Sequence, residues 1–416
     1  MKSLARFSMG IGDRFGRQGK AQLEALAEAQ RLGCTIIPVW NKSYREHSII
    51  HTDPNQVRKE ADGAVAALGW KEAYHVDADH ISLKTVDLFL DSSDFYTLDV
   101  ADYTGKPADE ASINRFVAKH RAFIGNQKIP GIDQPVPITE ESLRAVARKY
   151  LLAIQEAGKL YRYIAGKKGP GNFITEISID ETDLPQGPED LLFILAMIAD
   201  EQIPVQTIAP KFSGRFNKGV DYVGDLAQFE REFNQDILVI AFAVREFGLP
   251  ENLKLSVHSG SDKFSIYPAI KRAIYAHQAG LHLKTAGTTW LEELIGLASA
   301  GGSALDMAKQ IYREAYHRFD ELCAPYATVI DIRQDRLPSP DQVMSWDGET
   351  YAAALRHADT DPRYNPNFRQ LLHVGYKVAA ELGDAYLQAL EKAEDHIARQ
   401  VRENLLDRHI RQIFIQ

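Results

Sequence analysis

The stretch Lys254–Phe264, KLSVHSGSDKF, decides how the rest of the chain is interpreted. Its first four residues alternate polar and apolar side chains, which predicts a short strand. The strand stops at His258 and a polar loop follows: Ser259, Gly260, Ser261, Asp262 and Lys263. A buried strand that ends in a polar, charged loop is typical of the catalytic rim of an α/β barrel. The alternative is a simple strand end with a Ser-Gly turn and a solvated Asp-Lys pair.

The same pattern recurs elsewhere along the chain. Seven further segments have the composition of short strands, and helical spacing separates most of them: Leu4–Met9, Cys34–Trp40, Ala73–Val76, Phe95–Val100, Asn172–Ile179, Ile203–Ile208 and Gly280–Leu283. Eight strands alternating with helices predict a (β/α)8 barrel of the TIM type over residues 1–302. A doubly wound open sheet is the structural alternative, because it also alternates strands with helices.

Two segments exceed what such a barrel needs. Residues 109–168 have helical spacing with a Pro/Gly-rich interruption at 129–137, and they are too long for one crossover. We therefore expect a helical insertion there. Residues 303–416 are predicted to form a helical C-terminal extension, with an irregular span from 328 to 348, that packs on the barrel or across its mouth.

Composition restricts the classes of partner. The chain has 416 residues, a net charge of -9 and two cysteines. An acidic protein is a poor partner for nucleic acid or an anionic membrane. Two cysteines give no disulfide framework and no thiolate metal cage, which fits a reducing cytoplasm. No run approaches the roughly 20 apolar residues of a membrane span. The apolar run in the first ten residues is too short for a signal peptide. A homo-oligomer is compatible with this sequence.

Acids and imidazoles at the predicted strand ends suggest a metal site. His80, Asp180 and His258 each follow a different predicted strand. Such a donor set suits a divalent cation such as Zn, Mn, Co or Ni. The chain has no HxH or HExxH spacing, so the site would be assembled from separate strands. The alternative is that Asp79 caps the following segment while His80 is solvated.

Alternation within the strands points two acids toward the barrel interior. Glu176 and Asp180 share one face of their strand, while Ile177 and Ile179 share the other face, toward the surrounding helices. Asp77 occupies the corresponding place in the third strand. Inward charges cost several kcal/mol unless they are paired or bound to metal. Glu176 and Asp77 are therefore candidate catalytic bases, and the alternative for Glu176 is an internal salt bridge, for example with Lys254.

Cations and hydroxyls gather at the same strand ends. Lys263 is a candidate to stabilise an oxyanion, and the remaining candidates for substrate binding are Lys211, Arg215, Ser259, Ser261, Asp262, Lys284 and Thr285. Several fixed positive charges on one rim of an acidic protein favour a small anionic substrate, such as a sugar acid or sugar phosphate. For any one lysine, an ordinary surface position is the alternative. A glycine turn at Gly10–Gly16 lacks the dinucleotide-binding spacing and is weak support for a nucleotide.

The segment HSGSDKFSIYP, His258–Pro268, resembles the tagaturonate epimerase family. Four further segments fit the same family: HVDADHI (His75–Ile81), TEISIDETD (Thr175–Asp183), APKFSGRF (Ala209–Phe216) and HLKTAGTTWLE (His282–Glu292). The resemblance covers the chain from Met1 to about Gly302. It implies a metal-dependent enzyme of hexuronate catabolism that interconverts D-tagaturonate and D-fructuronate by inversion at C3.

That reaction restricts the chemistry. C3 is β to the C5 ketone, so its hydrogen is not acidified, and a retro-aldol cleavage of the C3–C4 bond is the favoured route. A metal would act as Lewis acid, and a carboxylate or histidine base would take the C3 hydroxyl proton. Transient oxidation by bound NAD is the competing route. Another metal-dependent keto-sugar isomerase or a class II aldolase would use the same residues, and a sugar-acid binding protein is the non-enzymatic alternative.

Overall fold

The structure is a computed structural model that describes residues 2–180, 182, 184–258 and 261–416. Eight parallel strands close into a barrel in which each pairs with its two neighbours. In barrel order the strands are β1 (Phe7–Ile11), β2 (Ile37–Ser43), β3 (His75–Ile81), β4 (Phe95–Asp99), β7 (Ile174–Ser178), β8 (Thr207–Ala209), β9 (Lys254–Val257) and β10 (Leu281–Lys284). The predicted TIM-type barrel is confirmed, and the open sheet is excluded because β10 pairs with β1.

One strand is much shorter than predicted. The expected strand Ile203–Ile208 is reduced to β8, which begins at Thr207. The segment before it contains Pro204, which has no N–H for a ladder, and the Val205 N–H bonds to the Ile203 carbonyl at 2.8 Å. This tight turn delays the start of the strand.

Helices surround the barrel on its outer side. The helices that alternate with the strands are α1 (Gly19–Arg31), α2 (Tyr44–Ile50), α3 (Pro54–Leu68), α6 (Pro188–Asp200), α7 (Leu226–Phe247), α8 (Tyr267–Ala276) and α9 (Thr289–Ala300). Helix α2 was not predicted, although its start carries a capping box. The Ser43 side chain accepts from the Glu46 N–H, and the Glu46 carboxylate accepts from the Ser43 N–H at 2.8 Å.

The barrel separates two apolar clusters. Odd and even positions of the strands face opposite sides, so Ile177 packs against the helices while Glu176 points into the barrel. The lower part of the interior is filled by a small apolar cluster: Leu4, Ile37, Val39, Phe95 and Ile174. Buried polar side chains lie above this cluster, nearer the carboxyl ends of the strands, and they form the floor of the site described below.

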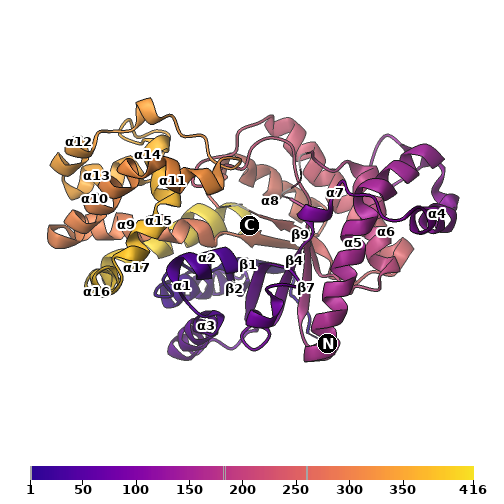
Figure 1. Ribbon diagram of the computed structural model, residues 1–416, viewed down its shortest axis with the longest axis horizontal. Coiled ribbons are helices and arrows are strands. Elements are labelled where there is room, and N and C mark those ends of the chain that lie inside the picture. The colour runs from indigo at the N-terminus through magenta and orange to yellow at the C-terminus, as the bar shows by residue number, and fades with distance from the viewer. Residues whose placement is uncertain (1, 181, 183, 259–260) are drawn as a thin grey trace.

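Residues 109–168 form an insertion that is helical at both ends but not in the middle. Its elements are α4 (Glu110–Lys119), a two-stranded antiparallel hairpin of β5 (Gly125–Gln127) and β6 (Val136–Ile138), and the long helix α5 (Glu140–Lys168). The hairpin was missed because each strand has only three residues and β6 contains Pro137. In Figure 1 the insertion lies at the opposite end of the molecule from the C-terminal helices.

The C-terminal residues are helical, as expected. They form α10 (Gly302–His317), α11 (Phe319–Cys323), α12 (Pro340–Ser345), α13 (Gly348–Leu355), α14 (Pro366–Val374), α15 (Tyr376–Glu381), α16 (Asp384–Lys392), α17 (Glu394–Glu403), a π-helical segment Asn404–Ile410 and α18 (Arg411–Ile413). Helix α12 lies inside the span expected to be irregular, and Ser339 and Pro340 mark its start. These helices pack on α9 and reach the barrel rim. None of the described helices is long and apolar enough to cross a bilayer.

Candidate active site

The structure brings the three predicted metal ligands together. His80, Asp180 and His258 each offer one ligand atom, and these atoms lie within 4.8 Å of one another. His258 directly follows β9, and Asp180 lies two residues beyond β7. His80 has a backbone φ of 53°, at the point where the register between β3 and β4 shifts. This bulge turns His80 toward the same interior as Asp77 and Asp79, which strand alternation alone would not do.

Carboxylates hold one nitrogen of each imidazole. His80 Nδ1 lies 3.0 Å from Asp79 Oδ1, and His258 Nε2 lies 2.7 Å from Glu176 Oε1. The other nitrogen of His258, Nδ1, is buried 3.3 Å from Asp180 Oδ1 and makes no hydrogen bond among the described residues. Histidines that bind metals usually donate their second ring N–H to a carboxylate. The donor set and its supporting carboxylates therefore fit a divalent cation.

Lys284 neutralises the acids beneath this cluster. Its Nζ lies 3.0 Å from Asp77 Oδ2, 2.7 Å from Asp79 Oδ1 and 2.9 Å from Glu176 Oε1. It also donates to Thr97 Oγ1 at 2.8 Å, so its three protons are engaged by protein groups. The predicted partner of Glu176 in a salt bridge, Lys254, instead donates to the Leu4 and Ala5 carbonyls.

Burial and these ion pairs shift the pKa values strongly. Burial raises the pKa of Asp77 to about 7, against the attraction of Lys284. Burial also opposes ionisation of Glu176, but Lys284 and His258 outweigh it and hold its pKa well below the usual range. Burial disfavours the imidazolium form of His80 and His258, yet Asp79 raises the pKa of His80 to about 10, and Asp180 raises that of His258 to about 9. A bound cation would replace these protons.

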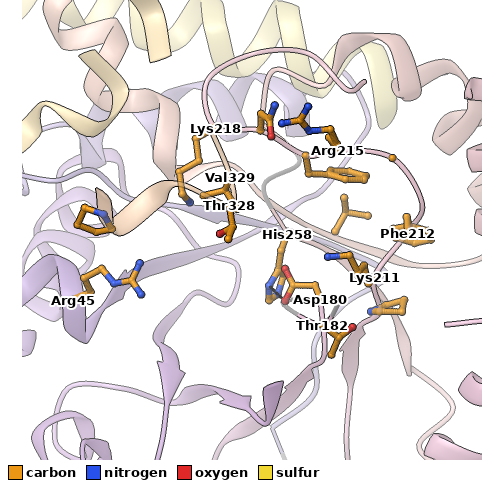
Figure 2. A pocket seen from close by; sticks show the side chains of 16 residues that line it. Arg45, Asp180, Thr182, Lys211, Phe212, Arg215, Lys218, His258, Thr328 and Val329 are labelled. Carbon is orange, nitrogen blue, oxygen red and sulfur yellow. Dashed lines mark ion pairs between the residues drawn. The ribbon is translucent and has the colours of Figure 1, made fainter. Parts of the chain in front are cut away.

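Two cavities meet at the cluster. An inner cavity of about 140 Å³ reaches His80, Asp79 and Lys284, and an outer one of about 510 Å³ opens beyond it. Asp180, Lys218 and His258 line both. Figure 2 shows His258 and Asp180 side by side, with Arg45 on one side and Lys211 on the other. Neither predicted base, Glu176 or Asp77, lines either cavity, because both lie beneath the lining.

Cations line both cavities. The outer cavity holds the predicted Lys211 and Arg215, together with Arg45 and Lys218 (Figure 2). Arg215 also lies 3.2 Å from Asp331. The inner cavity holds the predicted Lys263 and Lys284, together with Arg14 and Lys218. Lys263 Nζ donates to the Val220 and Ser261 carbonyls at 2.7 and 3.1 Å, and burial lowers its pKa to about 8.

Of the remaining predicted substrate ligands, some line a cavity and others do not. Ser261 lines the inner cavity, where its hydroxyl bonds to Thr288. Thr285 lines neither cavity, and its hydroxyl donates to the Gly10 carbonyl at 2.8 Å. Ser259 lies outside the described residues.

Asp262 faces the C-terminal helices instead of the cavities. It is fully buried with a backbone φ of 58°, and Oδ2 accepts from Arg369 Nη2 at 2.5 Å. His357 Nδ1 lies 3.3 Å from the same oxygen, and the Asp262 N–H donates to His409 Nε2 at 3.0 Å. Arg369 Nε also donates to the Gly219 carbonyl at 2.6 Å. One arginine thus joins the loop after β8 to the loop after β9, and both loops line the inner cavity.

The glycine turn at Gly10–Gly16 has a structural role, because its backbone N–H groups are bound by a side chain of the protein. The Asp13 carboxylate accepts the backbone N–H groups of Phe15, Gly16, Arg17 and Gln18. These are the N–H groups that a phosphate would need in a nucleotide-binding turn. A side chain at Gly12 would meet the Asn41 carbonyl at 2.9 Å. The turn therefore gives no support to bound NAD.

Several cavity residues were not predicted from the sequence. They are Arg14, Asn41, Arg45, Glu46, Asp79, Lys218 and His373. The sequence placed Asp79 among the polar residues at the end of the third predicted strand, with a cap of the following segment as the alternative. For Glu46 the sequence contains a local signal, because the Ser43–Glu46 capping box at the end of β2 indicates the start of a helix. His373 lies on α14, and no local pattern relates that helix to the barrel rim.

A closed parallel barrel with acids, imidazoles and cations around cavities at the carboxyl ends of its strands defines a TIM-type barrel enzyme for a small polar substrate. The chain belongs to the tagaturonate epimerase family, whose pattern it matches over residues 2–413. The tagaturonate/fructuronate epimerase of Thermotoga maritima is 29% identical over 421 residues, which cover 97% of this chain and 80% of that protein.

Solved structures agree with this assignment. A glycerol complex of the fructuronate-tagaturonate epimerase of Cohnella laeviribosi is 25% identical, with a TM-score of 0.80, and the match covers 99% of this chain and 82% of that one. The native structure of that epimerase has a TM-score of 0.79 at 25% identity over the same shares. The resemblance that the sequence motifs suggested is confirmed, and it extends through the C-terminal helices.

Proposed function

We propose that this protein interconverts D-tagaturonate and D-fructuronate by inversion at C3, with a divalent metal ion at His80, Asp180 and His258. The observation that carries the proposal is the position of these residues, because they meet where the inner and outer cavities join. Family membership supplies the substrate pair, and the cationic cavities support a substrate with a carboxylate.

The metal would be held by one nitrogen of each imidazole and by the Asp180 carboxylate. When bound, a divalent cation supplies Lewis-acid stabilisation of negative charge on the substrate ketone. Zn, Mn, Co and Ni all accept such nitrogen and oxygen ligands. Asp79 and Glu176 orient the two rings, so we assign Glu176 a positioning role in place of the predicted role as base. Asp77 contacts Lys284 and Thr97 below the cavity and supports the same network.

Cations in the two cavities would bind different parts of the substrate. Arg45, Lys211 and Lys218 lie around the outer cavity, where they would hold the carboxylate end (Figure 2). The ketone end would then enter the inner cavity. Lys263 lines the inner cavity and uses two of its three protons on carbonyls, so its third can stabilise an oxyanion. In a retro-aldol step the C3 hydroxyl loses its proton, the C3–C4 bond breaks, and its electrons form an enediolate. Attack on the opposite face of the aldehyde inverts C3.

The experiment is to incubate the purified protein with D-tagaturonate, with and without a chelator, and to follow the sugar acids by NMR. The proposal expects formation of D-fructuronate that stops on chelation and returns when metal is added. Accumulation of three-carbon fragments without epimer would instead support a class II aldolase. Hexuronate binding that is indifferent to chelator, with no turnover, would support a sugar-acid binding protein.

A further inference from the structure

We propose that His373, on the C-terminal helix α14, is a catalytic residue that exchanges the proton of the substrate C3 hydroxyl. The inference rests on the proposed retro-aldol function. It also gives the C-terminal helices a direct part in the reaction, because α14 lies more than 70 residues beyond the last barrel strand.

His373 lies at the right place for this contact. Its side chain lines the inner cavity together with His80, Asp180 and His258, and it is only 4% exposed. Two glycines make room for the ring. A Cβ on Gly219 would lie 3.1 Å from His373 Cδ2, and a Cβ on Gly287 would lie 3.4 Å from Nε2. The inner cavity holds about 140 Å³, so the ketone end of a six-carbon sugar acid that enters it would lie close to the lining groups, His373 among them.

The other proton acceptors of the inner cavity are already engaged. Glu46 pairs with Arg14, and Asp79 pairs with Lys284 and His80. Asp180, His80 and His258 form the candidate metal site. Among the described residues, neither ring nitrogen of His373 has a hydrogen-bond partner in the protein. Lys263, with a pKa of about 8, is the cation assigned to the oxyanion, so His373 is the uncharged acid–base side chain of this cavity that is left for the C3 hydroxyl.

The surroundings keep His373 neutral, which leaves a ring nitrogen able to accept a proton but also makes the ring a weak base that depends on a stabilised alkoxide. Burial, and then the positive charges of Lys218, Arg14, Arg369 and Lys263, hold its pKa well below the usual range. The same cations favour a developing alkoxide on C3. The neutral ring takes the hydroxyl proton as the C3–C4 bond breaks, and the imidazolium returns it to the new alkoxide after the bond re-forms, so the cycle has no net redox change or proton loss.

Hydrogen bonds from Arg369, on the same helix α14, also hold the His373 ring in place. Arg369 lies one turn before His373, and its guanidinium donates to the Gly219 carbonyl, the Leu355 carbonyl and Asp262. These bonds anchor the helix to the loop that carries Gly219. Arg369 is therefore a positioning residue for His373.

The test compares His373→Gln and His373→Ala with the wild-type protein and with Lys377→Ala. Lys377 lies four residues further along, on the next helix α15, and it pairs with Glu321 at the surface, so it is a nearby control outside the cavity. We expect kcat to fall about 100- to 10,000-fold in both His373 variants, while KM and metal content stay within about threefold. Added imidazole should restore part of the activity of His373→Ala, and Lys377→Ala should keep the wild-type kcat.

Two results would overturn the inference. One is a kcat within about threefold of wild type in either metal-loaded His373 variant. The other is a loss that imidazole does not rescue and that comes with a proportional loss of bound metal, which would mark a packing role. If the wild-type protein itself does not interconvert the two sugar acids, or does so after chelation, the proposed function fails and the His373 variants are not the cause.

Discussion

The Nε2 atom of His258 donates a hydrogen bond of 2.7 Å to Glu176 Oε1, and both side chains are buried. Glu176 thereby fixes which nitrogen of His258 faces Asp180. We predict that Glu176→Gln lowers metal affinity about 10- to 100-fold, because a supporting carboxylate of a metal-binding histidine is lost. Activity should recover in part at saturating metal. Titration of the metal-free variant measures the affinity, and Glu110→Gln on an exposed helix end is the control.

Should Glu176→Gln bind metal like wild type but show no turnover at any metal concentration, Glu176 would be a catalytic base after all. The split between affinity and turnover therefore separates the two roles.

Lys284 holds three carboxylates in the barrel interior. Lys284→Met leaves Asp77, Asp79 and Glu176 without their shared cation, and removing one partner of a buried ion pair costs about 3–5 kcal/mol. We expect the free energy of unfolding in urea to fall by that amount. The exposed Lys119–Asp200 pair provides the control, since Lys119→Met should cost at most about 1 kcal/mol. Equal effects of the two substitutions would contradict this account of the barrel interior.

Arg369 connects two rim loops through Gly219 and Asp262. We predict that Arg369→Met increases amide hydrogen exchange in residues 217–222 and 261–265, because both loops lose their shared anchor while Asp262 keeps a buried charge. The exchange of α3, which is remote from Arg369, should not change. Arg363→Met removes an exposed pair with Asp361 and serves as the matched substitution. Unchanged exchange in both loops would show that other contacts hold the rim.

Asp94 stabilises the opposite end of the barrel. Burial opposes its ionisation, but His75 and Lys2 outweigh burial and hold its pKa below the usual value. A depressed carboxyl pKa contributes stability that is present above the unfolded pKa, near 4, and that is lost as the pH falls toward the folded pKa. Asp94→Asn should therefore cost about 2 kcal/mol at pH 7, nearly as much at pH 4, and clearly less near pH 2. A penalty in urea unfolding that is independent of pH would contradict this assignment.

The barrel was predictable from the sequence because each strand carries its own signal. Alternation at residues 174–179 separates Glu176 from Ile177, and short apolar segments indicated all eight strands, although β8 is shorter and β3 longer than predicted. The candidate metal ligands His80, Asp180 and His258 could be proposed together from the sequence, since residues at the carboxyl ends of barrel strands converge whatever their separation in sequence. The orientation of His80 could not be predicted in this way, because it depends on a bulge in β3 that no local sequence pattern indicates.

The rest of the site depended on contacts between distant segments. The predicted bases Glu176 and Asp77 point inward, as expected, but they lie below the cavity, where they pair with Lys284 from the last strand. Asp262 was grouped with the substrate ligands because it follows His258, whereas its partners Arg369, His357 and His409 come from the C-terminal helices. Sequence spacing says nothing about such partners. For the same reason His373 was not predicted to line the cavity.

The central claim is that His80, Asp180 and His258 hold one metal ion that the epimerisation requires, and metal analysis of single variants tests it most directly. The exposed His277, which bonds to Asn234, is the control histidine. We predict about one divalent ion per wild-type or His277→Ala chain, and little metal and no conversion of D-tagaturonate in His258→Ala or Asp180→Ala. Full metal content together with wild-type turnover in His258→Ala would contradict the claim.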